Sequence, residues 1–259
     1  MIAFTKVSKS FDNGGKNFVK ALNEISFEIK RKEILCVVGP SGCGKSTVIN
    51  LLAGFIIPDS GSITVSGKEV AGPSYLRTVV FQDDALFPWK TVKDNIGFGL
   101  RCKGLDSNEQ AKKIGDILSI THLGEFSDCY PAQLSGGMKQ MCALGRALAI
   151  EPEIILMDEP FASLDQQTRD LIQEEFLKIK GQIAQTVLLV THNIDEAIFL
   201  GDKILVLTAR PAQIKEVITI PFEKPRSPDI RSTQKFIDIK SRIWHMLRND
   251  SGSVEYLCI

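Results

Sequence analysis

The chain has 259 residues, of which 44% are hydrophobic and 24% are charged, a composition typical of a globular protein with a substantial core. Basic and acidic residues both number 31, so the formal net charge is zero and favours no nucleic-acid partner. No apolar run approaches the roughly 20 residues that cross a bilayer. The first residues lack a basic segment followed by an apolar one, so we expect no secretory signal.

The alternating segments at 2–8 and 22–30 predict an antiparallel edge sheet that precedes the main core. Residues 34–38 (Ile-Leu-Cys-Val-Val) predict a buried strand, and residues 46–53 predict a helix after it. Further short apolar runs predict strands at 77–81, 154–157, 186–190 and 203–207. Short strands that alternate with helical patterns predict an α/β fold with a mostly parallel sheet.

Residues 91–150 differ in character, because helical patterns follow one another at 91–101, 108–120 and 137–149. We expect about 88–150 to form a helical insertion in the α/β core. Prolines 211, 221, 225 and 228 predict a looser C-terminal connection. An amphipathic helix should follow. Its apolar residues near one face are Phe236, Ile237, Ile239, Ile243, Trp244 and Leu247.

The six cysteines are scattered along the chain and form no C-x-x-C pair or His/Cys cluster. Such spacing predicts free, buried thiols in a reducing cytosol. They are Cys36, Cys43, Cys102, Cys129, Cys142 and Cys258.

A phosphate-binding loop follows the strand at 34–38 and fits the pattern G-x-x-x-x-G-K-[ST]. Its glycines let backbone N–H groups converge on phosphate oxygens, and the helix N-terminus adds positive charge. Lys45 should reach the β- and γ-phosphates, Ser46 should ligate Mg²⁺, and Thr47 can hydrogen-bond an α-phosphate. The predicted nucleotide-binding residues are Gly39, Pro40, Ser41, Gly42, Cys43, Gly44, Lys45, Ser46 and Thr47.

Residues 154–159 form an apolar strand that ends in two carboxylates, Asp158 and Glu159. In a chain with a phosphate loop, we expect Asp158 to hold Mg²⁺ through water near that loop. Glu159 can then act as the general base that polarises the attacking water.

A second glycine turn lies at Leu134-Ser-Gly-Gly-Met138 and begins a helix. Ser135 is a candidate N-cap, and Gly136 and Gly137 expose N–H groups at the positive helix end. Because one chain needs one site per triphosphate, this second anion site indicates the nucleotide of a partner subunit. A plain helix start is the alternative reading of the turn by itself.

The ordered set of motifs resembles the nucleotide-binding subunit of an ABC transporter over residues 1 to about 208. The order is the phosphate loop, Gln82 after a strand, Leu-Ser-Gly-Gly-x, Asp158-Glu159, Ser163-Leu-Asp165, and His192 after a strand. The resemblance implies that two subunits pair head to tail, with each ATP between one phosphate loop and the other subunit's serine–glycine turn.

The resemblance also implies individual roles. Gln82 would sense Mg²⁺ and the attacking water, Asp165 would couple the two sites across the dimer, and His192 would contact the γ-phosphate. Phe11 stands where an aromatic residue stacks on adenine, with Phe18 as the substitute. The chain would then hold an ATPase domain at 1–225 and a C-terminal helical tail at 226–259.

Four further segments, at 80–89, 95–100, 158–161 and 207–211, are similar to bacterial importers for nitrate, sulfonates and taurine. This implies a peripheral ATPase at the cytoplasmic face of the inner membrane, with permease partners and, indirectly, a solute-binding protein. Gln82 and Phe87-Pro88-Trp89 would line the groove that grips the permease; internal packing of these aromatic residues is the alternative.

Three departures from the family pattern stand out, and one is Met141, which stands where an arginine is common, on a helix that should pack internally. Met138 replaces the usual glutamine, so its side chain cannot hydrogen-bond a ribose, and Asn193 replaces the common aspartate but can still cap the helix at 193–200. The other readings are an exporter's ATPase subunit and a soluble, non-transport ABC ATPase. The segment at 207–211 followed by 220–226, which resembles the tail of these importers, and the Phe-Pro-Trp segment count against the first. The single phosphate loop counts against the second.

Overall fold

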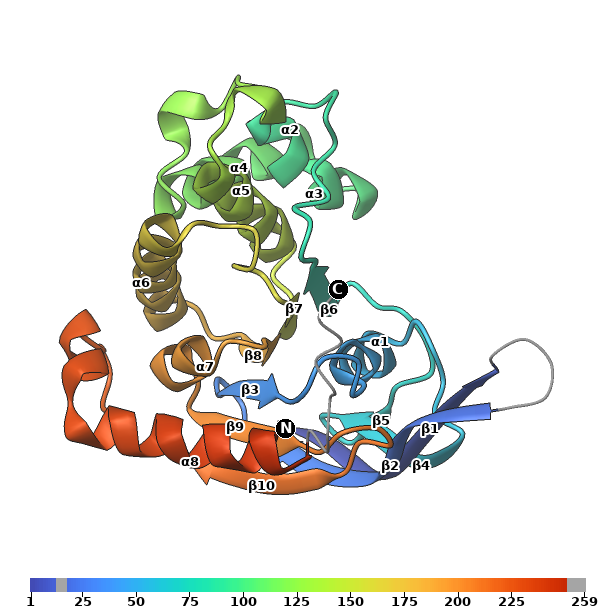
Figure 1. Ribbon diagram of the computed structural model, residues 1–259. Coiled ribbons are helices and arrows are strands. Elements are labelled where there is room, and N and C mark those ends of the chain that lie inside the picture. The colour runs from blue at the N-terminus through green and yellow to red at the C-terminus, as the bar shows by residue number, and fades with distance from the viewer. Residues whose placement is uncertain (13–17, 251–259) are drawn as a thin grey trace, which may run out of the picture. The chain divides into compact units, whose positions relative to one another are not determined.

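The computed structural model describes residues 1–12 and 18–250, which fold as two compact units (Figure 1). Among the described residues, the first unit comprises 1–12, 18–73 and 188–250, and the second comprises Ser74–Val187. The second unit therefore contains more of the chain than the helical insertion expected at 88–150. The proposed domain boundary at 225/226 stays a prediction.

An antiparallel sheet in the first unit confirms the predicted edge sheet. Its strands are β1 (Ile2–Asp12), β2 (Phe18–Ile29), β4 (Ser60–Val65) and β5 (Lys68–Glu69), in the order β2-β1-β4-β5. Phe4 lies opposite Phe27 in the β1–β2 register, and their rings stack with centroids 4.4 Å apart. Such cross-strand aromatic pairs stabilise a sheet and fix its register.

The parallel core of the first unit is built on β3 (Ile34–Val38). Its neighbours are β8 (Thr186–Val190) on one side and β9 (Lys203–Leu207) on the other, and β9 is parallel to β3. All five residues of β3 and of β8 are buried, as expected for apolar strands covered on both faces. The helices of this unit include α1 (Lys45–Ala53) and α7 (Ile194–Leu200).

The prediction of a loose connection is wrong at 214–219, where β10 (Ile214–Thr219) pairs antiparallel with β9. Burial alternates along β10, as in a half-exposed edge strand, although its residues, Ile-Lys-Glu-Val-Ile-Thr, do not alternate between apolar and polar.

The second unit holds the adjacent parallel strands β6 (Arg77–Val80) and β7 (Ile154–Asp158). The predicted helix at 91–101 is two short helices that meet at Gly97. The helices of this unit are α2 (Val92–Ile96), α3 (Phe98–Cys102), α4 (Ser107–Ile120), η1 (Gly124–Phe126), η2 (Pro131–Gln133), α5 (Gly136–Ala149) and α6 (Gln166–Gln182).

The C-terminal helix α8 (Gln234–Asp250), preceded by η3 (Pro228–Ser232), packs against α7 in the first unit. Phe236 and Ile243 are buried, whereas Ile237 and Trp244 are 47% and 46% exposed. The predicted amphipathic helix is therefore present, but its apolar face is only partly covered. Ile237 and Trp244 each lie about 100° around the helix from the buried residue before them.

The cysteine prediction is confirmed in part. Cys36, Cys43 and Cys142 are free and buried, but Cys102 is exposed and Cys129 is half-buried. Cys258 lies outside the described residues. Across the described residues, none of the helices has both the length and the apolar character that a membrane span requires.

Candidate functional site

The loop from Gly39 to Gly44 joins the buried strand β3 to helix α1 and has the backbone shape of an anion cradle. Gly42 and Gly44 have φ angles of +72° and +120°, values that side chains with a Cβ rarely adopt. A Cβ atom at Gly44 would lie 3.1 Å from Leu22 Cδ2 and 3.2 Å from the Ala21 carbonyl oxygen. Glycine is therefore required here by both conformation and space.

Lys45 is the buried cation of this loop. Its ammonium group donates hydrogen bonds to the carbonyl oxygens of Gly39, at 3.0 Å, and Pro40, at 3.1 Å. The side chain thus lies back over the loop, while the neighbouring Ser46 is exposed and Thr47 is half-buried. A cradle of glycines, an enclosed lysine and an exposed hydroxyl fit a magnesium–nucleotide.

Cys43 packs inside the same loop. Its backbone N–H donates to the Pro40 carbonyl oxygen at 3.2 Å, and burial of its side chain raises the pKa of the thiol. A protonated, buried thiol is a poor nucleophile, so Cys43 acts as a small packing residue.

Sequence reasoning missed one residue that touches the loop. The Arg210 guanidinium donates from Nε at 3.1 Å and from Nη2 at 2.7 Å to the Gly42 carbonyl oxygen. The two positions lie 168 residues apart, and the Arg-Pro pair served only as a mark of resemblance. No local pattern could have linked it to the loop.

The two candidate adenine-stacking residues lie at one end of the β1–β2 pair. Phe11 is opposite Val19, whereas Phe18 is opposite Asp12. Since successive residues of a strand face opposite sides, Phe11 and Phe18 belong to opposite faces. Both rings are exposed, so the geometry leaves either of them free to stack on a base, but not both from the same side.

His192 follows β8 in the first unit and is exposed. The preceding Thr191 donates its N–H to the Val37 carbonyl oxygen at 3.2 Å, which places His192 beside the strand that leads into the phosphate loop. Asn193 begins α7 and accepts a hydrogen bond from the Glu196 N–H at 3.2 Å, so the predicted cap is confirmed.

The second unit brings together Gln82, Asp158 and Glu159. Val80 lies opposite Met157 in the parallel β6–β7 pair, and the three polar residues follow at the same, carboxyl ends of these strands. Gln82 is exposed, and both acids are half-buried. Glu159 has φ +47°, an uncommon conformation for a non-glycine residue that tends to occur at functional sites.

The serine–glycine turn forms the N-terminus of α5, also in the second unit. Ser135 accepts a hydrogen bond from the Met138 N–H at 3.3 Å, which confirms the predicted cap. Ser135 and Gly136 are exposed. A Cβ at Gly137 would lie 3.0 Å from Thr168 Cγ2, so the start of α5 packs closely on α6.

Asp165 begins α6 beside this turn. Its carboxylate accepts a hydrogen bond from the Thr168 N–H at 3.0 Å, and this backbone donor lowers the pKa of the carboxyl group. Leu164 approaches Gly136, with a Cβ there 3.1 Å from Leu164 Cδ2. Asp165 and the serine–glycine turn are thus neighbours on one face of the second unit.

The aromatic segment before α2 is held by a buried amide. Asn95 accepts from the Phe87 N–H at 2.9 Å and donates to the Phe87 carbonyl oxygen at 3.2 Å. The Phe87 ring contacts Phe98 with centroids 4.7 Å apart. Trp89 remains 70% exposed. Phe87 therefore anchors the segment to the protein, and the indole of Trp89 faces solvent.

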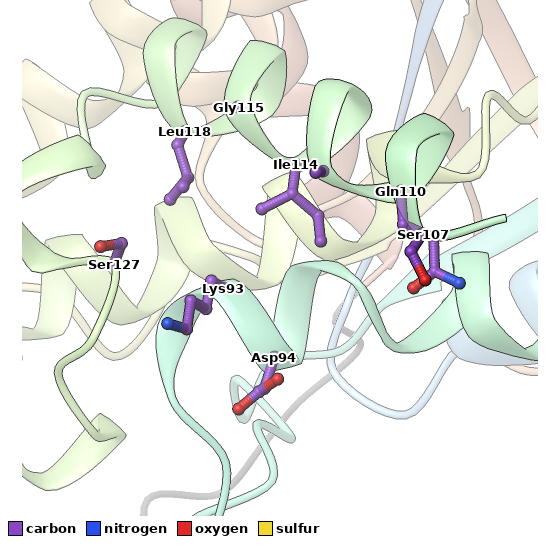
Figure 2. A pocket seen from close by; sticks show the side chains of 9 residues that line it. Lys93, Asp94, Ser107, Gln110, Ile114, Gly115, Leu118 and Ser127 are labelled. Carbon is purple, nitrogen blue, oxygen red and sulfur yellow. The ribbon is translucent and has the colours of Figure 1, made fainter. Parts of the chain in front are cut away.

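A shallow pocket of about 430 Å³ lies between α2 and α4 (Figure 2). It is lined by Lys93, Asp94, Ser107, Gln110, Ala111, Ile114, Gly115, Leu118 and Ser127. Ile114 and Leu118 of α4 point from one wall, and Lys93 and Asp94 stand on the other. Gln82, Phe87 and Trp89 are not among the lining residues, so this pocket differs from the predicted groove.

Comparison with known proteins identifies relatives among the ATP-binding proteins of ABC transporters. A family model described as "ABC transporter" matches residues 22–162. An uncharacterised ABC transporter ATP-binding protein of Methanocaldococcus jannaschii is 46% identical over 94% of this chain and 90% of its own length. A taurine import ATP-binding protein of Ruegeria pomeroyi is 38% identical over 98% of both chains.

Solved structures give the same fold. A dimeric ATP-binding cassette in a post-hydrolysis state, bound to ADP and Pi, matches with a TM-score of 0.73 and 28% identity, over 86% of this chain and 100% of its own. A Clostridium perfringens protein that is part of an ABC transporter complex matches with a TM-score of 0.78 over 95% and 98% of the two chains. At 24% identity it supports the fold alone.

Proposed function

Because the chain belongs to the ABC transporter ATP-binding family, in which ATP hydrolysis is the activity, we propose that it powers an importer of a small solute. The observation that carries the ATPase part of this proposal is the presence of two glycine turns in one chain: a sheltered loop with Lys45, and an exposed helix start at Ser135. The relatives named as taurine import proteins, such as that of Pelagibacter ubique at 42% identity over 88% of this chain, support import.

In this proposal the phosphate loop binds the nucleotide first. The Lys45 ammonium exchanges the carbonyls of Gly39 and Pro40 for the β- and γ-phosphate oxygens. The N–H groups of Gly42, Gly44, Lys45, Ser46 and Thr47 line the anion. Ser46 and, through water, Asp158 would hold Mg²⁺. The metal, when bound, neutralises charge that develops on the phosphates.

Hydrolysis is phosphoryl transfer to water. Glu159 polarises the attacking water, Gln82 orients it, and His192 donates to the γ-phosphate. These groups position reactants and stabilise charge, which accounts for most of the catalysis in such reactions. The adenine stacks on Phe11.

The serine–glycine turn is proposed to bind the γ-phosphate of the ATP that a second copy holds. Ser135, Gly136 and Gly137 present the positive end of α5 outward, and Asp165 beside them couples the two sites across the head-to-tail dimer. ATP would close this dimer, and hydrolysis and product release would reopen it. Met138 removes one ribose hydrogen bond but no group that hydrolyses ATP.

The closing motion must reach a permease, and we propose the exposed Trp89 with Gln82 as its contact. The buried Asn95 bonds the backbone of Phe87, two residues before Trp89. A displacement of Trp89 would therefore be transmitted to this buried residue. The working position is peripheral, at the cytoplasmic face of the inner membrane, with a solute-binding protein on the other side. Taurine, another sulfonate or nitrate is the proposed solute.

Proteoliposomes test the transport function. This chain is reconstituted with its permease, ATP–Mg²⁺ is enclosed on the ATPase side, and labelled taurine is supplied with the solute-binding protein on the other. We expect ATP-dependent uptake that Lys45→Ala abolishes and Trp89→Ala reduces while basal ATPase stays within about twofold. ATP-dependent export, or turnover with no response to the permease, would contradict the import proposal.

A further inference from the structure

We infer that Arg210, in the turn after β9, is a positioning residue that holds the phosphate loop in its nucleotide-binding shape. The inference rests on the proposed role of this loop, and it assigns the turn at 208–213 a part in ATP binding. Arg210 itself need not touch the nucleotide.

The contact is made to the middle of the loop. Both Nε, at 3.1 Å, and Nη2, at 2.7 Å, donate to the Gly42 carbonyl oxygen. A peptide unit is planar, so the direction of the Gly42 carbonyl also fixes the direction of the Cys43 N–H. That N–H meets the Pro40 carbonyl oxygen at 3.2 Å. The peptide between Gly42 and Cys43 is thus held at both ends.

This peptide needs such a restraint because of its composition. Gly42 and Gly44 on either side have positive φ angles, and glycine has more accessible backbone states than any other residue. An unrestrained loop would lose that freedom when it binds a nucleotide, at the expense of affinity. A guanidinium that grips the carbonyl removes part of the freedom beforehand.

The turn that carries Arg210 is itself firmly held. Ala212 is fully buried, its N–H donates to the Ala21 carbonyl oxygen at 2.9 Å, and its own carbonyl oxygen accepts from the Asn23 N–H at 2.9 Å. The Thr208 N–H closes the turn on the Gln213 carbonyl oxygen at 3.0 Å. Arg210 therefore projects from a rigid base rather than from a free surface loop.

The same region supports the loop at its other two glycines. A Cβ at Gly39 would lie 3.2 Å from Leu207 Cβ, at the end of β9. Gly44 rests against Ala21 and Leu22 of β2, the segment that Ala212 pairs with. The end of β9 and the turn after it thus contact the start, the middle and, through β2, the end of the phosphate loop.

A role of Arg210 in attracting phosphates and a role in positioning the loop predict different effects of Arg210→Lys. If Arg210 only attracted phosphates, lysine would replace it, because both side chains carry one positive charge. A lysine ammonium is a point donor and cannot place two fixed N–H groups on one carbonyl. The conservative variant therefore separates positioning from attraction.

Calorimetric titration with ADP–Mg²⁺ tests the inference, because ADP occupies the phosphate loop without turnover. We expect Arg210→Ala to raise the Kd about tenfold and Arg210→Lys to raise it about threefold, as the loss of a charge-assisted hydrogen bond predicts. The matched control is Arg31→Ala, an exposed arginine of the same unit whose guanidinium contacts Ser66 at 3.5 Å. Its Kd should stay within about twofold of the wild-type value.

Steady-state kinetics and melting complete the test. For Arg210→Ala, the KM for ATP should rise in parallel with the Kd, while kcat at saturating ATP and the melting temperature change little. An unchanged Kd, a wild-type Kd in Arg210→Lys, or a fall in kcat and melting temperature at constant KM would overturn the positioning role. Lys45→Ala is measured alongside: normal ADP binding and turnover in that variant would refute the loop assignment itself, whatever Arg210 does.

Discussion

The two glycine turns of this chain differ in how much of their own protein surrounds them. In the first unit, the phosphate loop encloses its cation: Lys45 is buried, and its donors meet carbonyls of the loop itself. In the second unit, Ser135 and Gly136 are exposed at the start of α5, and the described contact of the Ser135 hydroxyl is the cap on Met138. We therefore propose that the first turn is a complete anion site and that the second presents half of one outward.

Rigidity is common to both turns, although its source differs. The phosphate loop is gripped by a distant arginine and by β2. The serine–glycine turn is held because Gly137 packs closely on α6, where a Cβ would lie 3.0 Å from Thr168 Cγ2. Preorganised backbone donors bind anions with less loss of entropy. The difference fits our proposal that the first turn binds a nucleotide by itself and that the second meets one brought by another copy.

Removing the cation of the sheltered turn should have the largest effect. Lys45→Ala leaves the β- and γ-phosphates without their buried ammonium, so we expect ATPase activity to fall at least about a hundredfold, with weaker nucleotide binding. Phosphate release at saturating ATP measures it, and Arg31→Ala serves as the surface control. Turnover of Lys45→Ala above a tenth of the wild-type rate would refute the role of the phosphate loop as the complete anion site.

Glu159→Gln should separate chemistry from binding. The variant keeps the shape of the side chain but cannot accept a proton, so kcat should fall by about 10²–10³, within the range of general-base catalysis. The Kd for ADP–Mg²⁺ should stay within about threefold. Glu125→Gln, an exposed acid of the same unit, should behave as wild type. A normal kcat in Glu159→Gln would assign the base elsewhere.

Asn95→Ala probes the rigid anchor of the aromatic segment. Asn95 is fully buried, and its amide bonds the backbone of Phe87, Lys90 and Thr91. Loss of these partners should lower the free energy of unfolding by about 2–4 kcal/mol, seen as a lower melting temperature. Basal ATPase per folded molecule should change little. Unchanged stability would mean that the segment is held by its aromatic contacts alone.

The smallest effect should be a difference in alkylation rate between buried and exposed cysteines. It tests whether the phosphate loop keeps Cys43 away from solvent. Burial raises the pKa of the Cys43 thiol and raises the pKa of Cys142 to about 12, so at pH 8 both are mostly protonated and react slowly. Alkylation followed by mass spectrometry should modify the exposed Cys102 before Cys43 and Cys142. Equal alkylation rates of Cys43 and Cys102 in the folded protein would show that the phosphate loop opens readily. In denaturant, the control, the two rates should be equal.

Local patterns predicted much of the site, because strands, caps and the phosphate loop depend on neighbouring residues. The apolar runs at β3, β8 and β9 and the caps at Ser135 and Asn193 followed from sequence alone. Arg210 could not be predicted, since its contact with Gly42 joins residues far apart in the chain and arises only when β9 folds beside β3.

Other features could not be predicted because they too depend on contacts between distant segments. β10 was missed because prolines flank it and its polar residues become an edge strand only through pairing with β9. The exposed faces of Ile237 and Trp244 on α8 depend on which side packs against α7. Periodicity shows that a helix has an apolar face but does not fix which of two adjacent stripes is covered.

The central claim, one complete site and one outward half-site, is tested most directly by size-exclusion chromatography of Glu159→Gln. Because this variant should bind ATP without hydrolysing it, we predict a monomer that becomes a dimer when ATP–Mg²⁺ is added. The additional change Ser135→Arg, which crowds the exposed turn, should abolish the shift while ADP binding persists. A protein that stays monomeric with saturating ATP, or a dimer that Ser135→Arg leaves intact, would contradict the account.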